Sequence, residues 1–588
     1  MGDVFNRVVG KLPKGQQKAL RAIAEDGTRF WISALVLLSA ALLMQFDVLR
    51  RFELVTYDYR CIVRGDRPAD PRVVVVEISD DSISKIGRWP WDRDWHATLI
   101  KVLTELGAKA VAFDVIFAEP SDPKKDEVLA ASVKTSGLVY LAEVIEESSK
   151  GPSLLGSIPS ISGPARGTGH INLQPDIDGV MRRIPFFMEG GKGPVPQLSL
   201  AVAADELGID LGRAVVRPGL ARLPYKAGGS LNVPLDRNGN FIINWTGRWK
   251  DSYEHYSYID VIASYTVFKK GGLPPISTDA FKGKLIYVGT TASGLFDIRP
   301  TPLEPSYPAV GVNLTVLNNL LEKRFIREVS RWQHLLVLLL LALLLYRIMK
   351  LQSYMKAALL TLGTLVGYAA VAVALFAFGG LWLNMIYPSL LITATYFCVT
   401  LYNQLSVAIE KAKLMKLATR DSLTGLFNIG HFKLLLKAEI TTVSLRREKS
   451  LSLIMGDVDN FKKTNDTYGH LTGDMVLREV AQAVRSNCRA LDVAARYGGE
   501  EFILMLPGAN VDQAVKVAEN IRKAIEAKVF FNEKGDFQTS ISIGVTQVSP
   551  DDKDIDAIVA RADRALYDAK HTGKNRVVVA ADSPRVMV

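Results

Sequence analysis

Four long runs of apolar residues constrain this chain more than any other feature of its sequence. They cover residues 30–46, 332–349, 357–379 and 385–402. A helix needs about 20 apolar residues to cross the hydrocarbon core of a bilayer, and the first run is close to the lower limit. The last three runs are nearly free of charge and joined by short loops, which argues against buried helices of a soluble protein. The sequence therefore predicts four transmembrane helices.

The first run also has some features of a cleaved signal peptide. The stretch before it is long for the basic region of such a peptide, and Ser39, Ala40 and Ala41 form only a weak cleavage site inside the run. We therefore expect an uncleaved membrane anchor.

Lysine and arginine residues flank the runs in an alternating pattern. The loop at 380–384 has none, and the other flanks carry Arg7, Lys11, Lys14, Lys18, Arg21, Arg29, Arg347, Lys350, Lys356, Lys411, Lys413, Lys416 and Arg420. Cytoplasmic flanks are enriched in such residues. We expect residues 1–29 inside, a span at 30–47, residues 48–330 outside, three spans within 331–402, and the remainder inside.

The net charge of +10 does not by itself indicate a nucleic-acid-binding protein. Much of the lysine and arginine lies beside the apolar runs, where it sets membrane orientation and contacts anionic lipid. No basic stripe with interleaved aromatic residues is present, so no nucleic-acid partner is expected. The three cysteines form no CxxC motif, and only Cys61 leaves open a bridge between two chains.

The predicted outer segment, residues 48–330, alternates strand and helix patterns. Residues 73–78 form a continuous apolar run, as in a buried parallel strand, and 96–106 have helical periodicity. Further strands are expected at 110–117, 138–145 and 285–289. This alternation predicts an α/β domain with a partly parallel sheet.

Polar residues gather at the ends of these strands. They are Asp80, Asp81 and Asp114, with a Trp89-Pro90-Trp91 turn between them. Taken singly, they are more typical of turns and helix caps than of a catalytic site. Together with their position between one span and three spans, they resemble the second class of CHASE extracellular sensor domains. That resemblance implies an input domain for an extracytoplasmic ligand that the sequence does not identify.

The segment 403–420 follows the last span. Leu401, Leu405, Ala408, Ala412 and Met415 are spaced by 4, 3, 4 and 3 residues, which is the spacing of a coiled-coil seam. Two heptads also fit an amphipathic helix on the membrane surface, and both interpretations stay open. A parallel two-chain coiled coil would carry a change from the spans to the domain that follows.

The C-terminal segment, 421–588, contains a cluster of acidic residues at strand ends. A strand expected at 451–457 ends in Asp457, and two further strands at 493–497 and 502–506 flank Gly498, Gly499, Glu500 and Glu501. Glycines between two apolar strands predict a hairpin whose tip can approach a ligand closely. If the strands are neighbours, Asp457 and Glu500 converge as oxygen ligands for Mg²⁺, which suits phosphoryl or nucleotidyl transfer.

The sequence Gly-Gly-Glu-Glu-Phe at 498–502 resembles the GGDEF domain in its GGEEF form. Further blocks of that family occur in the same order, at 421–428, 457–466, 469–474, 542–545, 562–570 and 573–576. The resemblance implies a central sheet with flanking helices, similar to the nucleotidyl-cyclase palm. The fold class is thus a multidomain α/β membrane protein with an α/β sensor, four transmembrane helices and a C-terminal GGDEF domain.

The resemblance also implies roles for individual residues. Asp457, Glu500 and the Val458 carbonyl would bind metal, with two Mg²⁺ per GTP site and Mn²⁺ as an alternative. Glu501 would lie beside the reacting ribose and the glycines Gly498 and Gly499 beside the nucleotide. The residues expected to bind the substrate's phosphates or guanine are Lys462, Lys570 and Lys574 for phosphate, and Asn465 and Asp474 for guanine. Lys570 and Lys574, four residues apart, fit one face at a helix end.

The activity implied is a diguanylate cyclase. Two such domains, each holding one GTP, would face each other in a homodimer and form cyclic di-GMP and two pyrophosphates. Arg489 and Asp492 match the position at which product binds and inhibits the enzyme. The expected location is a bacterial inner membrane, with the sensor outside and the GGDEF domain in the cytoplasm. The alternative is a catalytically silent receptor for GTP or cyclic di-GMP.

Overall fold

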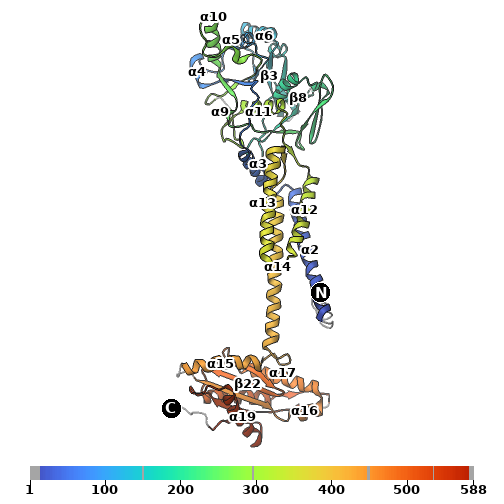
Figure 1. Ribbon diagram of the computed structural model, residues 1–588, viewed down its shortest axis with the longest axis vertical. Coiled ribbons are helices and arrows are strands. Elements are labelled where there is room, and N and C mark those ends of the chain that lie inside the picture. Colours follow the sequence, from blue (N-terminus) through green and yellow to red (C-terminus); the bar gives the residue numbers. More distant parts are fainter. Residues whose placement is uncertain are drawn as a thin grey trace. The chain divides into compact units, whose positions relative to one another are not determined.

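The computed structural model of the chain forms two compact units, Met1–Leu401 and Tyr402–Val588 (Figure 1). It describes residues 14–148, 151–191, 193–294, 297–351, 353–445, 450–533 and 535–581. Arg7 and Lys11, part of the predicted basic flank, lie outside the described residues.

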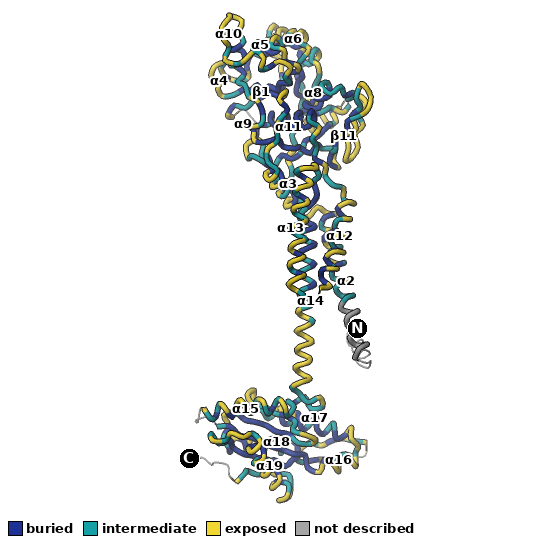
Figure 2. The backbone as a smooth tube through the Cα atoms, in the orientation of Figure 1, coloured by how far each residue is buried: buried dark blue, intermediate teal, exposed yellow. Residues whose placement is uncertain are grey.

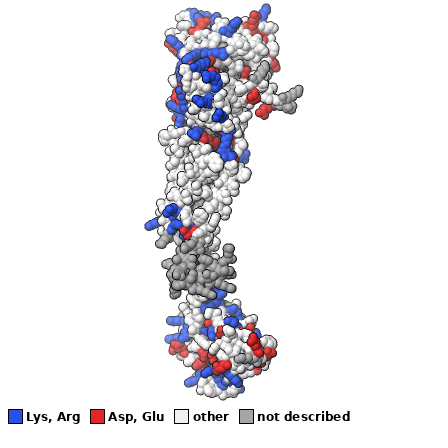
Figure 3. Space-filling view, turned by 90° about the vertical axis from the view of Figure 1, so that its right-hand side faces the viewer, with Lys and Arg blue, Asp and Glu red and all other residues white. Residues whose placement is uncertain are grey.

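Four helices are long and apolar enough to cross a membrane. They are the segment Asp26–Gln45 of α2 (Lys14–Gln45), α12 (Arg331–Met349), α13 (Tyr354–Gly379) and α14 (Ile386–Thr419). In each helix only 17–33% of the most apolar 18-residue stretch is buried in the protein. Most of the apolar surface of these helices is therefore available for contact with lipid (Figure 2). The surface of the spans carries few charged side chains (Figure 3). These helices contain the four predicted apolar runs except for their end residues Phe46 and Met385.

The last of these helices does not end where its apolar run ends. α14 continues without a break to Thr419 and therefore includes nearly all of the segment that the sequence assigns to a linker. Leu405 and Met415 on the expected coiled-coil seam are 55% and 62% exposed in the single chain.

The N-terminal unit contains a seven-stranded sheet in the order β13-β1-β14-β2-β3-β4, with β5 paired to β3. Its strands are β1 (Val73–Ile78), β2 (Ala110–Phe113), β3 (Val139–Ser148), β4 (Gly151–Leu155), β5 (Gly167–His170), β13 (Glu254–Ser257) and β14 (Leu285–Thr290). All pairs are parallel except β3 with β4. The run of valines in β1 is buried on both faces, because one core cluster lies on each side of the sheet. The predicted partly parallel α/β sheet is confirmed.

One strand of this sheet is shorter than the sequence predicts. The strand expected at 110–117 ends at Phe113, because the apolar run stops there and Asp114 starts a loop. The strand expected at 285–289 is present as β14, and it lies between β1 and β2, a position that the sequence did not predict. Helices cover the two faces: α5 (Arg93–Glu105), α6 (Pro123–Ser136), α8 (Leu198–Leu207), α10 (Tyr258–Lys269) and α11 (Ala309–Leu321).

Cys61 lies in α3 (Arg50–Arg64) and is completely buried. Burial raises the pKa of its thiol to about 12. The bridge between two chains that the sequence left open is therefore not available to this thiol in the folded unit.

The C-terminal unit is built on a six-stranded sheet in the order β19-β21-β22-β20-β25-β26. Its outer strands are β19 (Phe427–Asn428) and β26 (Val577–Val579), and β21 (Val493–Gly498) lies beside β19. The central strand β20 (Leu451–Val458) is antiparallel to β22 (Glu501–Pro507) and to β25 (Ile541–Gln547). All eight residues of β20 are buried, because core clusters lie on both faces of the sheet. The helices α16 (Phe461–Tyr468), α17 (His470–Ser486) and α19 (Ile555–His571) carry four of the predicted nucleotide-binding residues, Lys462, Asn465, Asp474 and Lys570.

Candidate active site

A tight hairpin turn presents the Gly-Gly-Glu-Glu sequence at the edge of the sheet. β21 (Val493–Gly498) pairs with β22 so that Gly498 lies opposite Glu501. This register leaves Gly499 and Glu500 as the two turn residues. Gly499 has a φ of 45°, in the left-handed region that favours glycine in such turns.

The three predicted catalytic carboxylates come together at this turn. Asp457 in β20 lies directly opposite Glu501 in β22. The backbone N–H of Val458 donates to the Glu500 carbonyl over 3.3 Å, which fixes the turn against the end of β20. The structure thus brings Asp457, Glu500 and Glu501 into one cluster, as the sequence pattern predicts.

The electrostatics of this cluster favour a cation. Asp457 is only 5% exposed, and burial raises its pKa although Lys570, with its Nζ at 2.7 Å, acts in the opposite direction. Burial likewise raises the pKa of Glu501, with the charge of Asp457 as the next cause. Neighbouring carboxylates repel one another and are stabilised by positive charge.

The donor set fits Mg²⁺. Among the described residues no group of three His, Cys, Asp or Glu side chains is arranged to hold a metal ion. The candidate ligands here are instead two carboxylates and one backbone carbonyl. Asp457, Glu500 and the Val458 carbonyl would hold the ion. Magnesium takes oxygen ligands and is commonly bound by one or two carboxylates plus substrate phosphates and water.

Asp459, two residues after Asp457, has a different environment. Its carboxylate accepts hydrogen bonds from the hydroxyls of Ser540 and Ser542 at 2.7 and 2.6 Å, and from the Asn575 backbone N–H at 3.1 Å. It is 3% exposed. These bonds hold the loop after β20 in place, so Asp459 is a structural residue.

The three predicted phosphate lysines lie on different elements. Lys462 is exposed on α16, and Lys570 contacts Asp457 near the end of α19. α19 ends at His571, and Lys574 follows with a φ of 61° and donates to the Asn460 side chain over 2.5 Å. The expectation that Lys570 and Lys574 share one face at a helix end is therefore wrong, because the helix stops between them.

The predicted guanine-binding residues lie around the junction of α16 and α17. The Asn465 side-chain oxygen is buried and has no hydrogen-bond partner among the described residues. A Cβ on Gly473 would lie 1.9 Å from that oxygen, so only glycine leaves space for the amide. Asp474 follows directly in α17 and is half-buried. An amide oxygen without a partner and a neighbouring carboxylate form an acceptor-rich site that suits the N–H edge of a guanine.

One contact of the turn was missed by sequence reasoning. Arg496 donates from Nε and Nη2 to the Gly499 carbonyl, at 2.9 and 2.7 Å, and its Nη1 lies 3.4 Å from Asp421. The Asp421 carboxylate also accepts from the backbone and hydroxyl of Thr424. Asp421 belongs to the motif at 421–428, which the sequence singled out without a role. Arg496 thus joins the first turn of the domain to the Gly-Gly-Glu-Glu hairpin.

The Arg489–Asp492 pair forms a surface turn. The Arg489 backbone N–H donates to the Asp492 carboxylate over 2.7 Å, and the Asp492 N–H donates to the Arg489 carbonyl over 3.1 Å. This arrangement leaves the Arg489 side chain exposed to solvent.

Comparison with known proteins assigns both parts of the chain. Residues 33–347 match the CHASE2 domain, and residues 418–576 match the domain described as "Diguanylate cyclase, GGDEF domain". Diguanylate cyclase A of Treponema denticola is 42% identical over 180 residues, which are 30% of this chain and 48% of that protein. Response regulator PleD of Caulobacter vibrioides is 39% identical over 166 residues, 28% of this chain and 36% of that protein.

A solved structure of the coiled coil and GGDEF domain of DgcB from Caulobacter crescentus, in complex with c-di-GMP, is 28% identical. It covers 31% of this chain and 97% of that chain, with a TM-score of 0.30. The chain spans about half, or less, of the length of the curated relatives it matches. Both resemblances seen in the sequence are confirmed: the chain belongs to the CHASE2-domain family and carries a GGDEF domain at its C-terminal side.

Proposed function

We propose that the chain is a membrane-bound diguanylate cyclase that condenses two GTP into cyclic di-GMP and two pyrophosphates. The observation that carries the proposal is the convergence of Asp457, Glu500 and Glu501 at the junction of β20 and β22. The relatives named diguanylate cyclase, at about 40% identity over this domain, support the same activity.

Each residue of the site has its own role in the proposed reaction. Bound Mg²⁺ supplies positive charge that stabilises the phosphates and the reacting oxygens. Asn465 and Asp474 accept hydrogen bonds from guanine and fix the base. Glu501 would take the proton from the ribose 3′-hydroxyl, and burial, which raises the pKa of its carboxyl, makes it a stronger base. Lys570, which contacts Asp457, would bind the triphosphate.

The reaction requires two copies of the domain, because each binds one GTP. We propose a homodimer formed along α14, where the exposed Leu405 and Met415 provide an apolar seam. The basic flanks support a topology with the CHASE2 domain outside the cytoplasm of a bacterium and the GGDEF domain inside. The extracytoplasmic domain then controls the cyclase, and product bound at Arg489 and Asp492 inhibits it.

The test measures product from the full-length protein in lipid nanodiscs. GTP and Mg²⁺ are added, and cyclic di-GMP and pyrophosphate are quantified by chromatography. The expected result is both products from the wild type and a loss of at least about 100-fold in Glu500→Gln, since a metal ligand is removed.

The matched control is Glu519→Gln. This carboxylate lies on α18 (Val511–Glu526) and pairs with Arg522 at 3.1 Å, so its loss leaves the reaction unchanged. If a dimeric wild-type sample makes no cyclic di-GMP, the cyclase proposal fails and the alternative of a nucleotide receptor is favoured. Binding of GTP or cyclic di-GMP to the same sample then tests that alternative.

A further inference from the structure

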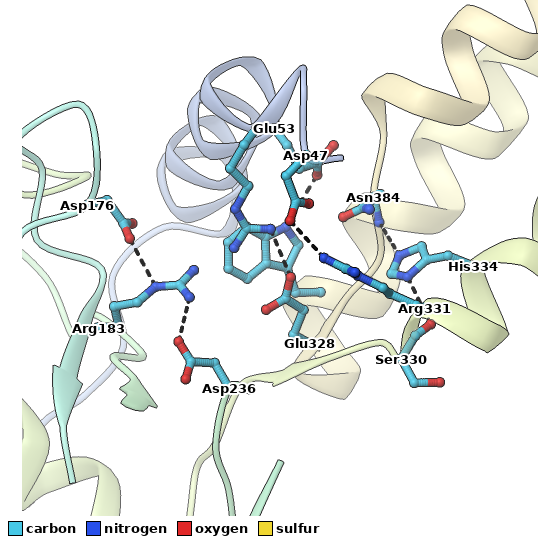
Figure 4. Close-up of polar contacts among 12 residues, drawn as sticks. Asp47, Glu53, Asp176, Arg183, Asp236, Glu328, Ser330, Arg331, His334 and Asn384 are labelled. Carbon is cyan, nitrogen blue, oxygen red and sulfur yellow. Dashed lines mark hydrogen bonds and ion pairs between the residues drawn. The ribbon is translucent and has the colours of Figure 1, made fainter. Parts of the chain in front are cut away.

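A cavity of about 430 Å³ lies in the N-terminal unit beside the ends of the candidate spans. Its walls come from the end of α2, from α3, from the start of α12, from the segment before α14 and from loops of the α/β domain around residues 174–177 and 236–240 (Figure 4). Charged side chains dominate the lining. Four of them are arginines: Arg50, Arg183, Arg237 and Arg331.

Three of the four arginines are already bound by carboxylates. Arg50 pairs with Glu328 at 2.9 Å, and Arg331 pairs with Asp47 at 2.8 Å. Arg183 contacts both Asp176 and Asp236, at 3.0 and 2.6 Å (Figure 4). Every carboxylate that lines the cavity is therefore engaged.

Asp236 has no capacity left for a further cation. One of its oxygens accepts from the backbone N–H groups of Asn238 and Asn240, at 2.8 Å each, and the other binds Arg183. The same loop carries Arg237, which also lines the cavity.

Arg237 is the unpaired cation of the cavity. Among the described residues its guanidinium has no ion pair. Arg237 and Arg331 line the same cavity, and partial burial together with the charge of Arg331 lowers the pKa of Arg237. Two neighbouring arginines favour an anion between them, and the planar guanidinium fork matches phosphate oxygens.

The position of the cavity in the chain indicates the source of such an anion. Met44 and Asp47 lie at the end of the first candidate span, Arg331 and His334 at the start of the second, and Asn384 just before α14. These are the levels at which a spanning helix leaves the hydrocarbon and meets lipid headgroups. An occupant there also lies next to the start of α14, where the buried Glu53 accepts the backbone N–H groups of Met385 and Ile386.

We propose that this cavity binds a phosphate group, with Arg237 and Arg331 as its principal ligands. The phosphate belongs either to an anionic lipid headgroup or to a soluble phosphate, and both share the chemistry that the arginines recognise. Such an occupant makes the CHASE2 domain sensitive to its membrane or its solution surroundings at the base of α14.

Tryptophan fluorescence separates this cavity from the nucleotide site. All eight tryptophans lie between residues 31 and 382, so their signal reports on the N-terminal unit alone. Trp382 is also close to the network, with the Arg50 and Arg183 guanidiniums 5.1 and 5.7 Å from its ring. Phosphate bound at the GGDEF site therefore does not contribute directly to the signal.

The experiment uses full-length protein in nanodiscs and has two arms. In the first, inorganic phosphate is titrated in phosphatidylcholine nanodiscs at constant ionic strength. In the second, the unfolding midpoint is compared between phosphatidylcholine nanodiscs and nanodiscs that also contain phosphatidylglycerol. The variants are Arg237→Gln, the charge-conserving Arg237→Lys, and as control Arg217→Gln, an exposed arginine on β9 (Val215–Arg217) away from the cavity.

The expected result is a saturable phosphate response in the first arm, whose apparent affinity Arg237→Gln weakens by about tenfold or more, or a higher unfolding midpoint with phosphatidylglycerol in the second arm, which Arg237→Gln abolishes, because a charge-assisted contact is lost. Arg237→Lys retains part of the response, and Arg217→Gln retains all of it. A response in the first arm identifies soluble phosphate, and one in the second identifies the lipid. No response in either arm, or an equal response in Arg237→Gln and wild type, overturns the proposal whatever the cyclase assay shows.

Discussion

Acidic residues lie at strand ends in both α/β units, but their surroundings differ. In the N-terminal domain Asp80 follows β1 and accepts from the backbone N–H and hydroxyl of Ser293, at 2.9 Å each. Asp114 follows β2 and accepts from the Asn313 amide at 3.2 Å. In the C-terminal unit Asp457 lies opposite Glu501 and beside Glu500, and one lysine contacts the group.

This difference distinguishes acidic residues that stabilise the fold from acidic residues that can bind a cation and a substrate. An isolated carboxylate held by neutral donors is satisfied, and its removal costs the hydrogen bonds that it makes. A cluster of carboxylates with too little positive charge remains ready for a cation and a substrate.

The largest expected effect is on catalysis. Asp457→Asn removes a metal ligand and lowers cyclic di-GMP formation by at least about 100-fold. The matching change in the other unit, Asp80→Asn, lowers the tryptophan-detected unfolding midpoint by weakening its bonds to Ser293 and leaves magnesium dependence as in the wild type. Equal losses of activity in the two variants would contradict the distinction.

The next prediction concerns two glycines at which an added Cβ would clash with a neighbouring side chain. A Cβ on Gly473 meets the Asn465 amide oxygen, whereas a Cβ on Gly311 meets the rings of Tyr307 and Trp249 at 2.5 and 2.7 Å. Gly473→Ala is expected to raise KM for GTP by about tenfold or more, because the base loses a hydrogen-bond partner.

Gly311→Ala is expected to lower the unfolding midpoint of the N-terminal unit, because the packed rings must move. Gly430→Ala is the control within the GGDEF domain, since its nearest neighbour, the Asn428 side chain, lies at 3.5 Å. Steady-state kinetics separate KM from kcat. An unchanged KM in Gly473→Ala would remove Asn465 from the base-binding site.

A third effect compares two arginines. Arg182 is completely buried and bound by Asp58, Asp176 and Asp178, whereas the Arg489 side chain is exposed. Arg489→Ala is therefore expected to leave folding intact and to raise the cyclic di-GMP concentration needed for half-inhibition by about tenfold or more, since a charged ligand contact is lost. Arg478→Ala, an exposed arginine on α17, is the control. Unaltered inhibition in Arg489→Ala would place the product site elsewhere.

The smallest effect concerns pH. Burial raises the pKa of Asp114 to about 6, so its charged form is less favourable in the folded than in the unfolded state. The N-terminal unit therefore loses stability as the pH rises from the unfolded-state pKa of about 3.9 toward 6. Asp114→Asn is expected to remove this loss, which unfolding midpoints followed by tryptophan fluorescence from acid to neutral pH will measure. A parallel pH dependence in variant and wild type would contradict it.

Much of this architecture is visible in the sequence because it rests on local patterns. The valine run of β1, the turn glycines and the apolar spans each predict their element, and the order of motif blocks identifies the GGDEF domain. Long-range pairing is not local: nothing near residue 285 indicates that β14 lies between β1 and β2. The contact of Arg496 with the Gly499 carbonyl was missed for the same reason that Arg237 was missed, because an arginine's partner depends on which loops the fold brings together.

Because α14 is one unbroken helix, the number of its residues sets the angle of rotation between its two ends. Its 34 residues run from beside the membrane-proximal cavity to the turn that starts the GGDEF domain. Each residue advances an α-helix by 1.5 Å and about 100° of rotation, so seven residues make nearly two full turns. Inserting or deleting one residue therefore turns whatever is attached at Thr419 by more than a quarter of a circle, whereas a seven-residue insertion nearly restores its phase.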